Sequence, residues 1–271
     1  MKNTLITLTL LFSLFFVFNG FKNKDFDHFV PFKKSKAIAP DKYFVSKFEL
    51  TNADYQLFLD DIEATKGKDA VKSLMPEGDN WEKLFTTVSS SGKPYSEFYF
   101  THPAYANYPV VNLRKEAINE YCKWLTGKYY TMEKREHAEV IFRLPTEEEW
   151  LIFASPIPGN NLPWHGNKPY KPKGEFDVEY MGNLKIMDYS KGSYNYILDG
   201  ALRTHKVGQY PPNKIGLYDI IGNVAEYTSD GKIKGGSWYN TIEECGVDLV
   251  QSFDVSDPRV GFRLVMEVIK E

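Results

Sequence analysis

The residues best suited to chemistry gather in the segment 216–245. Asp219 and Glu226 flank the pair Gly222 and Asn223, so two carboxylates and several backbone carbonyls can converge on one point. Oxygen ligands of this kind are what a hard cation such as calcium requires. The segment therefore predicts a metal-binding bend.

A second group of functional residues follows directly in the chain. Gly235 and Gly236 let the backbone pass where a Cβ would clash, and they bring Ser237, Trp238 and Asn240 to one place. The segment then ends on Cys245, one of only two cysteines in the chain. We interpret the whole stretch as a segment that builds a site.

Composition limits the classes of protein that can present such a site. Apolar residues make up 42% of the chain and aromatic residues 15%, which is enough for a real core and argues against disorder. The net charge of −3 is spread over mixed acidic and basic residues, so no basic stripe indicates nucleic-acid binding. A length of 271 residues fits one large domain or two small ones.

The N-terminus predicts export. The apolar run from Leu5 to Phe18 is short for a membrane span and fits the central part of a signal peptide within residues 1–20. Gly20 is small but Phe18 is bulky near the cleavage point, so an uncleaved anchor stays open. We expect a periplasmic, envelope or extracellular protein, in which Cys122 and Cys245 are free to pair if their geometry allows it.

The elements that must position the site follow from periodicity and capping. Residues 21–42 are polar, contain two prolines and read as a linker into a single domain at 43–271. Alternation and helical spacing predict strands at 43–50, 109–111, 140–144 and 260–266, and helices at 52–62, 79–85, 114–126 and from 147 through Phe153.

Two groups of tempting residues have simpler explanations. Thr146 and Glu149 have the spacing of a capping box, so the three glutamates at 147–149 stabilise a helix start and are not catalytic. Cys122 lies on the apolar stripe of its helix and is a core residue. Residues 155–213 show little periodicity, and so long a loop needs something to hold it.

Seven blocks of sequence, taken together, resemble one family. They are FELTNADY, YPVVNLRKEAINEYCKWL, FRLPTEEEW, LPWHGN, VGQYPPNKIGLYDIIGNVAEYTSD, KGGSW and VGFRL. In this order, over residues 43–266, they resemble the formylglycine-generating enzymes, also called sulfatase-modifying factors. The resemblance implies an α+β domain with a variant C-type lectin-like fold that is poor in regular secondary structure.

The resemblance also implies two calcium ions that tie down the long loops. One set of ligands falls on Asp219, Gly222, Val224 and Glu226, and the other on Asn183, Leu184, Asp199 and Ala201. A loop held at both ends in this way would be ordered without helices. Solvation and turn hydrogen bonds are the alternative role for each of these carboxylates.

Copper, by contrast, is not expected. Family members hold copper(I) between two cysteines that follow the Gly-Gly-Ser turn, and here the first position is Asn240 and the second is Cys245. An amide does not replace a soft thiolate ligand. Ser237 is kept, but Glu244 stands where the family has an aromatic residue. Leu264 stands where the family has the disulfide partner of Cys122.

These departures lead to a hypothesis and its alternatives. We expect a non-catalytic, calcium-stabilised domain in the cell envelope whose groove binds a peptide, a glycan or a partner protein, rather than an enzyme. An active oxidase that makes formylglycine with copper and oxygen would need a second thiol beside Cys245. Another metal-dependent oxygenase is a further alternative, although the five histidines form no ligand pair, and a purely structural role is the last.

Overall fold

The computed structural model describes residues 26–32, 42–78, 80–84, 94–154, 160–175, 177–254 and 256–271. The predicted export segment at 1–20 lies outside the described residues. Within those ranges no helix is both long enough and apolar enough to cross a membrane.

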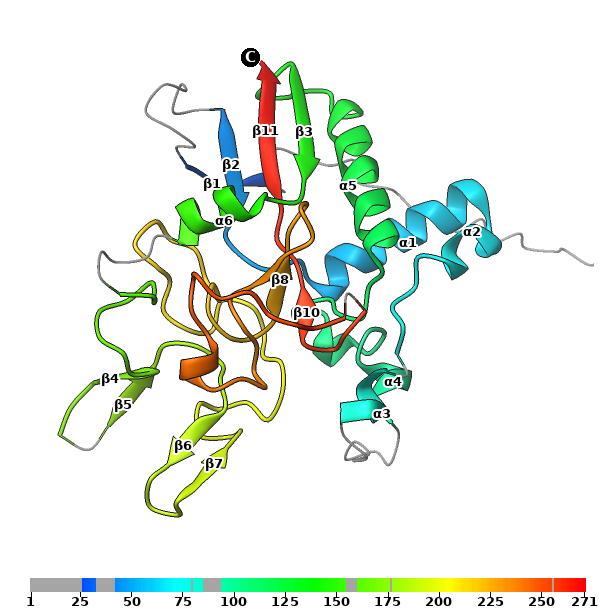
Figure 1. Cartoon of the computed structure of the whole chain (residues 1–271). Helices are drawn as coiled ribbons and strands as arrows, with labels where there is room; N and C mark the ends of the chain where they lie inside the picture. Colours follow the sequence, from blue (N-terminus) through cyan, green and yellow to red (C-terminus); the bar gives the residue numbers. More distant parts are fainter. Residues whose placement is uncertain are drawn as a thin grey trace, which may run out of the picture.

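A four-stranded antiparallel sheet holds the two ends of the described chain together (Figure 1). Its order is β1 (Phe29–Pro31), β2 (Tyr43–Ser46), β11 (Val265–Lys270) and β3 (Glu139–Arg143). Strand β1 lies inside the predicted linker, and its Phe29 is buried in the core. The folded unit therefore begins before residue 43.

Two of the predicted strands are shorter than their alternation indicates. Strand β2 ends at Ser46, short of the predicted Leu50, although the amide of Lys47 still donates to the carbonyl of His28 in the register of β1. At 109–111 only Pro109 pairs, in an isolated bridge with Thr51. In both places burial, rather than sheet pairing, explains the apolar residues.

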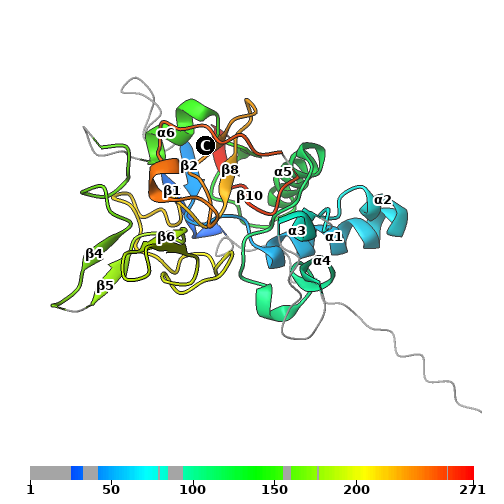
Figure 2. The ribbon, with the colours of Figure 1, turned by 60° about the horizontal axis from the view of Figure 1, so that its bottom comes forward.

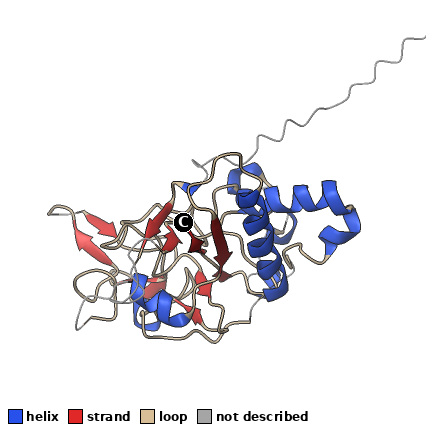
Figure 3. Cartoon of the chain, turned by 90° about the horizontal axis from the view of Figure 1, so that it is seen from above, coloured by secondary structure: helices blue, strands red, loops and turns tan. Residues whose placement is uncertain are grey.

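The main helices gather on one side of the molecule, opposite the hairpins (Figure 3). Helix α1 (Asn52–Lys66) starts with a capping box between Thr51 and Asp54. Helix α5 (Lys115–Tyr130) packs along β3 and against α1. The shorter helices are α2 (Lys68–Lys72), α3 (Asn80–Leu84), α4 (Tyr95–Phe98) and α6 (Glu147–Ala154), with 3-10 turns at Pro103–Tyr105 and Ile242–Glu244.

The predicted capping box of α6 is confirmed. The amide of Glu149 donates to Thr146 Oγ1 at 3.2 Å, and the amide of Thr146 donates to Glu149 Oε2 at 3.0 Å. Glu149 also accepts hydrogen bonds from Arg143. Its carboxylate therefore fixes the start of the helix to the end of β3.

A second, three-stranded sheet carries Glu226 of the candidate site on its central strand. It has the order β10 (Val260–Gly261), β8 (Ala225–Tyr227) and β9 (Ile233–Lys234), with β10 parallel to β8. The predicted strand at 260–266 is therefore divided between two sheets. Arg263 lies at the crossing between them.

The long predicted loop contains two small hairpins. They are β4 (Tyr170–Pro172) with β5 (Val178–Tyr180), and β6 (Ile186–Asp188) with β7 (Ser193–Asn195), all labelled in Figure 1. Figure 2 shows β4, β5 and β6 from another side. The remainder of this region is irregular, and the mixed α+β class with little regular structure is as expected.

The two cysteines lie in different parts of the core. Cys122 is buried with α1 and α5, whereas Cys245 is buried in a second cluster with Trp150 and Leu184. Both are free thiols. A disulfide between them, left open by the sequence, is not formed.

Candidate functional site

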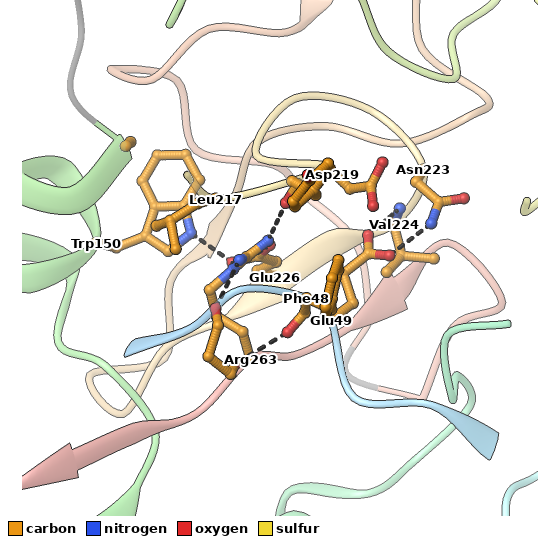
Figure 4. A network of polar contacts seen from close by, with 12 residues as sticks. Phe48, Glu49, Trp150, Leu217, Asp219, Asn223, Val224, Glu226 and Arg263 are labelled. Atoms are coloured by element: carbon orange, nitrogen blue, oxygen red, sulfur yellow. Dashed lines mark hydrogen bonds and ion pairs between the residues drawn. The ribbon is translucent and has the colours of Figure 1, made fainter. Parts of the chain in front are cut away.

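A fully buried ion pair lies at the crossing of the two sheets (Figure 4). Arg263 Nε donates to both carboxylate oxygens of Glu226, at 2.7 and 2.8 Å. Trp150 Nε1 donates to Glu226 Oε2 at 2.7 Å. The remaining guanidinium nitrogens of Arg263 donate to backbone carbonyls of Ser46, Lys47 and Tyr218. The side chain of Arg263 thus joins its own segment to two others that are distant in sequence, 46–47 and 218–226.

Two further buried carboxylates lie near this pair. Glu49 accepts hydrogen bonds from the amide of Val224 at 3.0 Å and from Asn223 Nδ2. Burial, with the charges of Asp219 and Glu226 nearby, raises the pKa of Glu49 well above its usual value. Three carboxylates therefore share one guanidinium, which leaves this part of the core rich in hydrogen-bond acceptors.

Asp219 is only partly satisfied. Its Oδ2 accepts the amide of Gly208 at 2.6 Å, while its buried Oδ1 has no hydrogen-bond partner among the described residues. Burial raises the pKa of Asp219 to about 6. Asp219 and Asn223 both have a left-handed backbone conformation, with φ of 56° and 54°, which is uncommon for residues other than glycine.

The second predicted ligand set also comes together. Asp199 Oδ2 accepts the amide of Leu184 at 2.6 Å, and Asp199 Oδ1 accepts the amide of Ala201 at 3.2 Å. Asn183 Nδ2 donates to Asn223 Oδ1 at 3.1 Å, so the two ligand sets are neighbours. Burial raises the pKa of Asp199 to about 7.

The fit of calcium differs between the two sets. Asn183 Oδ1 is buried without a partner among the described residues, and the amide of the next residue, Leu184, donates to Asp199. Glu226, in contrast, is engaged by Arg263, and a cation in the first set would compete with that guanidinium. No group of three His, Cys, Asp or Glu side chains in the described part of the chain is arranged for a metal, so carbonyl and amide oxygens would have to complete either set.

Asn240 performs a structural role in the predicted copper position. Both the amide and the Oγ of Ser237 donate to Asn240 Oδ1, at 3.0 and 2.8 Å. The amide of Asn240 returns a bond to the carbonyl of Ser237 at 2.9 Å. The side chain at the position that the resemblance assigns to the first copper cysteine therefore closes a tight turn.

Cys245 faces the same turn but is buried. Its Sγ overlaps the position that a Cβ on Gly236 would take. The residue Cys245 is only 4% exposed. Burial raises the pKa of Cys245, which disfavours the thiolate that copper(I) requires. Ser237, Asn240 and Cys245 thus lie at one turn, with one sulfur between them, and all three residues are buried.

The other two departures from the family pattern also have structural roles. Glu244 Oε2 accepts the amide of Thr241 at 2.8 Å and completes the capping box of the turn Ile242–Glu244. Leu264 is buried in the same core cluster as Cys122. An apolar contact region therefore stands where the resemblance implies a disulfide.

Sequence reasoning missed Glu49. The only signal for it was a carboxylate between the apolar residues Phe48 and Leu50. A carboxylate that is buried there needs a hydrogen-bond donor or an opposite charge. The partner, the Asn223–Val224 peptide, lies about 175 positions away in the chain. No local pattern connects the two.

Comparison with known proteins gives one family. The model of the sulfatase-modifying factor enzyme 1-like domain matches residues 19–268. The chain is 29% identical to the formylglycine-generating enzyme of Mus musculus over 216 residues, which cover 72% of this chain and 51% of the relative. It is 32% identical to the inactive C-alpha-formylglycine-generating enzyme 2 of Bos taurus over 147 residues, covering 50% and 40%.

Solved structures show the same fold. PvdO from Pseudomonas aeruginosa superimposes with a TM-score of 0.56 at 19% identity, covering 83% of this chain and 80% of the other. At that identity the likeness concerns the fold alone. The chain spans about half the length of the mouse relative and less of the bovine one.

Proposed function

The chain belongs to the sulfatase-modifying factor family, and we propose that it is a non-catalytic member that keeps the domain as a binding module. The observation that carries this proposal is the hydrogen bonding of Asn240. Its amide oxygen accepts two bonds from Ser237, so the position is adapted to holding the turn and not to holding a metal.

The remaining chemistry of the turn supports the same proposal. Copper(I) needs two soft thiolates, and Cys245 supplies one buried thiol with a raised pKa. Cys122 is buried in a different core cluster and does not supply the other. One of the relatives is itself named as inactive, which supports a non-catalytic role for a chain similar to it.

A copper assay tests this proposal. The full chain, reduced and incubated with copper(I), oxygen and a peptide carrying a sulfatase-type cysteine, should leave the peptide mass unchanged. Its affinity for copper(I), measured by competition with a chromophoric chelator, should equal that of the Cys245→Ala variant. Formation of formylglycine by the wild-type chain would refute the proposal in favour of an active oxidase.

Asn240→Cys provides the matched variant. It returns a second thiol beside Cys245, and copper(I) affinity should rise about tenfold or more because two thiolates then share the ion. If Asn240→Cys binds copper(I) no better than the wild type, the match of positions 240 and 245 to the copper pair is wrong.

We also propose calcium as a stabilising ligand at the Asn183–Asp199 set. The unpartnered Asn183 Oδ1 and the raised pKa of Asp199 support this set more than the first one, where Arg263 occupies Glu226. The apolar run Leu5–Phe18 supports action outside the cytoplasm. A binding module of the cell envelope is the role that combines these features.

A further inference from the structure

The side-chain ammonium of Lys185 lies among the rings of three tyrosines. Its Nζ lies 5.3 Å from the ring centroid of Tyr194, 5.9 Å from that of Tyr196 and 5.3 Å from that of Tyr239. Within the described part of the chain, no carboxylate forms an ion pair with this ammonium and no acceptor hydrogen-bonds to it. An ammonium carries three N–H donors, so an oxygen acceptor is missing from its surroundings.

The other charged groups nearby already have partners. Arg259 stacks on Tyr239 at 5.2 Å but forms a two-point contact with Asp257. Lys191, on the same hairpin as Tyr194, lies 3.6 Å from Asp188. Lys185 is therefore the ammonium in this region that an anion can approach without displacing a carboxylate.

The aromatic rings around it are held in place. Tyr196 and Tyr239 pack against the buried Trp238, with ring centroids 6.3 and 5.7 Å from it. Tyr194 lies on β7 and is 47% exposed. Tyr196 and Tyr239 therefore offer packed aromatic faces, so a ligand that binds them orders little beyond the Tyr194 side chain.

This cluster adjoins the turn that replaces the copper site. The amide of Lys185 donates to the carbonyl of Asn240 at 2.9 Å, and Tyr239 is the residue before Asn240. A ligand on the tyrosines would thus lie beside the turn held by Ser237 and Asn240. The turn itself is buried, so the cluster is the accessible part of this region.

We propose that Lys185, Tyr194, Tyr196 and Tyr239 bind an acidic saccharide. Its carboxylate or sulfate would accept hydrogen bonds from the Lys185 ammonium, its ring face would pack on the tyrosines, and its hydroxyls would bond the phenol groups. One free charge among several hydroxyl-bearing rings matches a hydroxyl-rich ligand with a single anion better than a densely charged peptide. The inference deepens the proposed binding role and rests on it.

Calorimetric titration of the full chain tests the inference with named probes. A disaccharide with one glucuronate residue supplies a single carboxylate, a monosulfated disaccharide supplies a single sulfate, and maltose supplies neutral rings. We expect binding to at least one acidic saccharide and none to the neutral one. The preferred acidic probe identifies the anion.

Matched variants on one hairpin separate specific from general binding. Lys185→Met should weaken binding about tenfold or more, because a charged hydrogen bond is lost, whereas Lys191→Met should leave it unchanged. Tyr194→Ala should weaken binding, whereas Tyr189→Ala, at an 83% exposed tyrosine, should not. These surface variants keep the core and should fold.

The outcomes that overturn the inference are specific. Absence of binding to both acidic saccharides, equal losses in Lys185→Met and Lys191→Met, or tighter binding of an oligoglutamate than of either saccharide would each refute it. None of these results alters the copper assay. Failure of the saccharide site is thus distinguishable from failure of the non-catalytic role.

Discussion

A single arginine organises the candidate site. Arg263 pairs with Glu226 in the fully buried core and donates to carbonyls of three other residues. Removing one member of a buried pair leaves the other charge unpaired in a medium that solvates it poorly. The stability of the whole crossing should therefore depend on this side chain.

Arg263→Met tests that dependence. We expect the free energy of unfolding, measured in urea, to fall by about 3–5 kcal/mol. Glu226→Gln, which keeps one acceptor oxygen but removes the charge and the second acceptor, serves as a second variant if the first does not fold. Lys123→Met, at the exposed pair with Glu120, is the control and should change stability by less than about 1 kcal/mol. Similar losses in Arg263→Met and Lys123→Met would contradict this account of the pair.

The turn at Gly235–Gly236 links β9 to the candidate site, and its glycines are required for two separate reasons. Gly236 has a φ of 72°, which disfavours any side chain, and Cys245 Sγ occupies the space of a Cβ. Gly231, with a φ of 82° and no close neighbour at its Cβ position, shares only the first reason. Substitutions at Gly231 and Gly236 therefore separate the cost of backbone strain from the cost of steric overlap.

Gly231→Ala should lower the free energy of unfolding by about 1 kcal/mol, and Gly236→Ala by more than about 2 kcal/mol, since overlap adds to strain. In a Gly236→Ala/Cys245→Ala double-mutant cycle, a coupling of about 0.5–3 kcal/mol should return part of the loss. Urea denaturation of the four variants measures both quantities. Additive losses in the cycle would show that Cys245 and Gly236 do not contact each other.

At the scale of elements, capping and helical periodicity predicted α1, α5 and α6 because their signals are local. The division of 260–266 between two sheets was not predictable, since Gly261 and Arg263 look like part of one apolar strand. Strand β1 was missed because its pairing partner β2 lies more than ten residues away across a segment rich in lysine and proline. Sheet membership is decided by distant partners, which a single sequence does not display.

At the scale of the whole molecule, the order of sequence blocks predicted the family and the fold class, and the family model confirms that prediction. It did not predict how the two calcium sets relate to each other. In the structure Asn183 and Asn223 join them, because the amide of Asn223 also donates to the carbonyl of Asn183 at 3.0 Å. The hydrogen bonds between Asn183 and Asn223 therefore hold segments 183–201 and 219–226 together, and we call these two segments the polar centre.

A cation in this centre would stabilise the molecule by linking those segments. It would also favour the ionised form of Asp199, whose pKa burial raises to about 7. A ligand that binds only the folded state at one hundred times its dissociation constant adds about 2.7 kcal/mol to the free energy of unfolding. For a chain of this size, each kcal/mol corresponds to a rise of about 2–4 °C in melting temperature.

Thermal melts with calcium, with magnesium and with EDTA measure this effect. Calcium should raise the melting temperature more than magnesium does, because irregular sets of amide and carbonyl oxygens suit the larger ion. Asp199→Asn should abolish most of the calcium shift, while Asp188→Asn, on the nearby strand β6, should keep it. Asp219→Asn separates the two sets: if only this variant loses the shift, calcium binds the first set despite Arg263. Equal melting temperatures in calcium and EDTA would contradict a calcium site in either set, and the Asn183–Asn223 pair would then hold the two segments together without a metal.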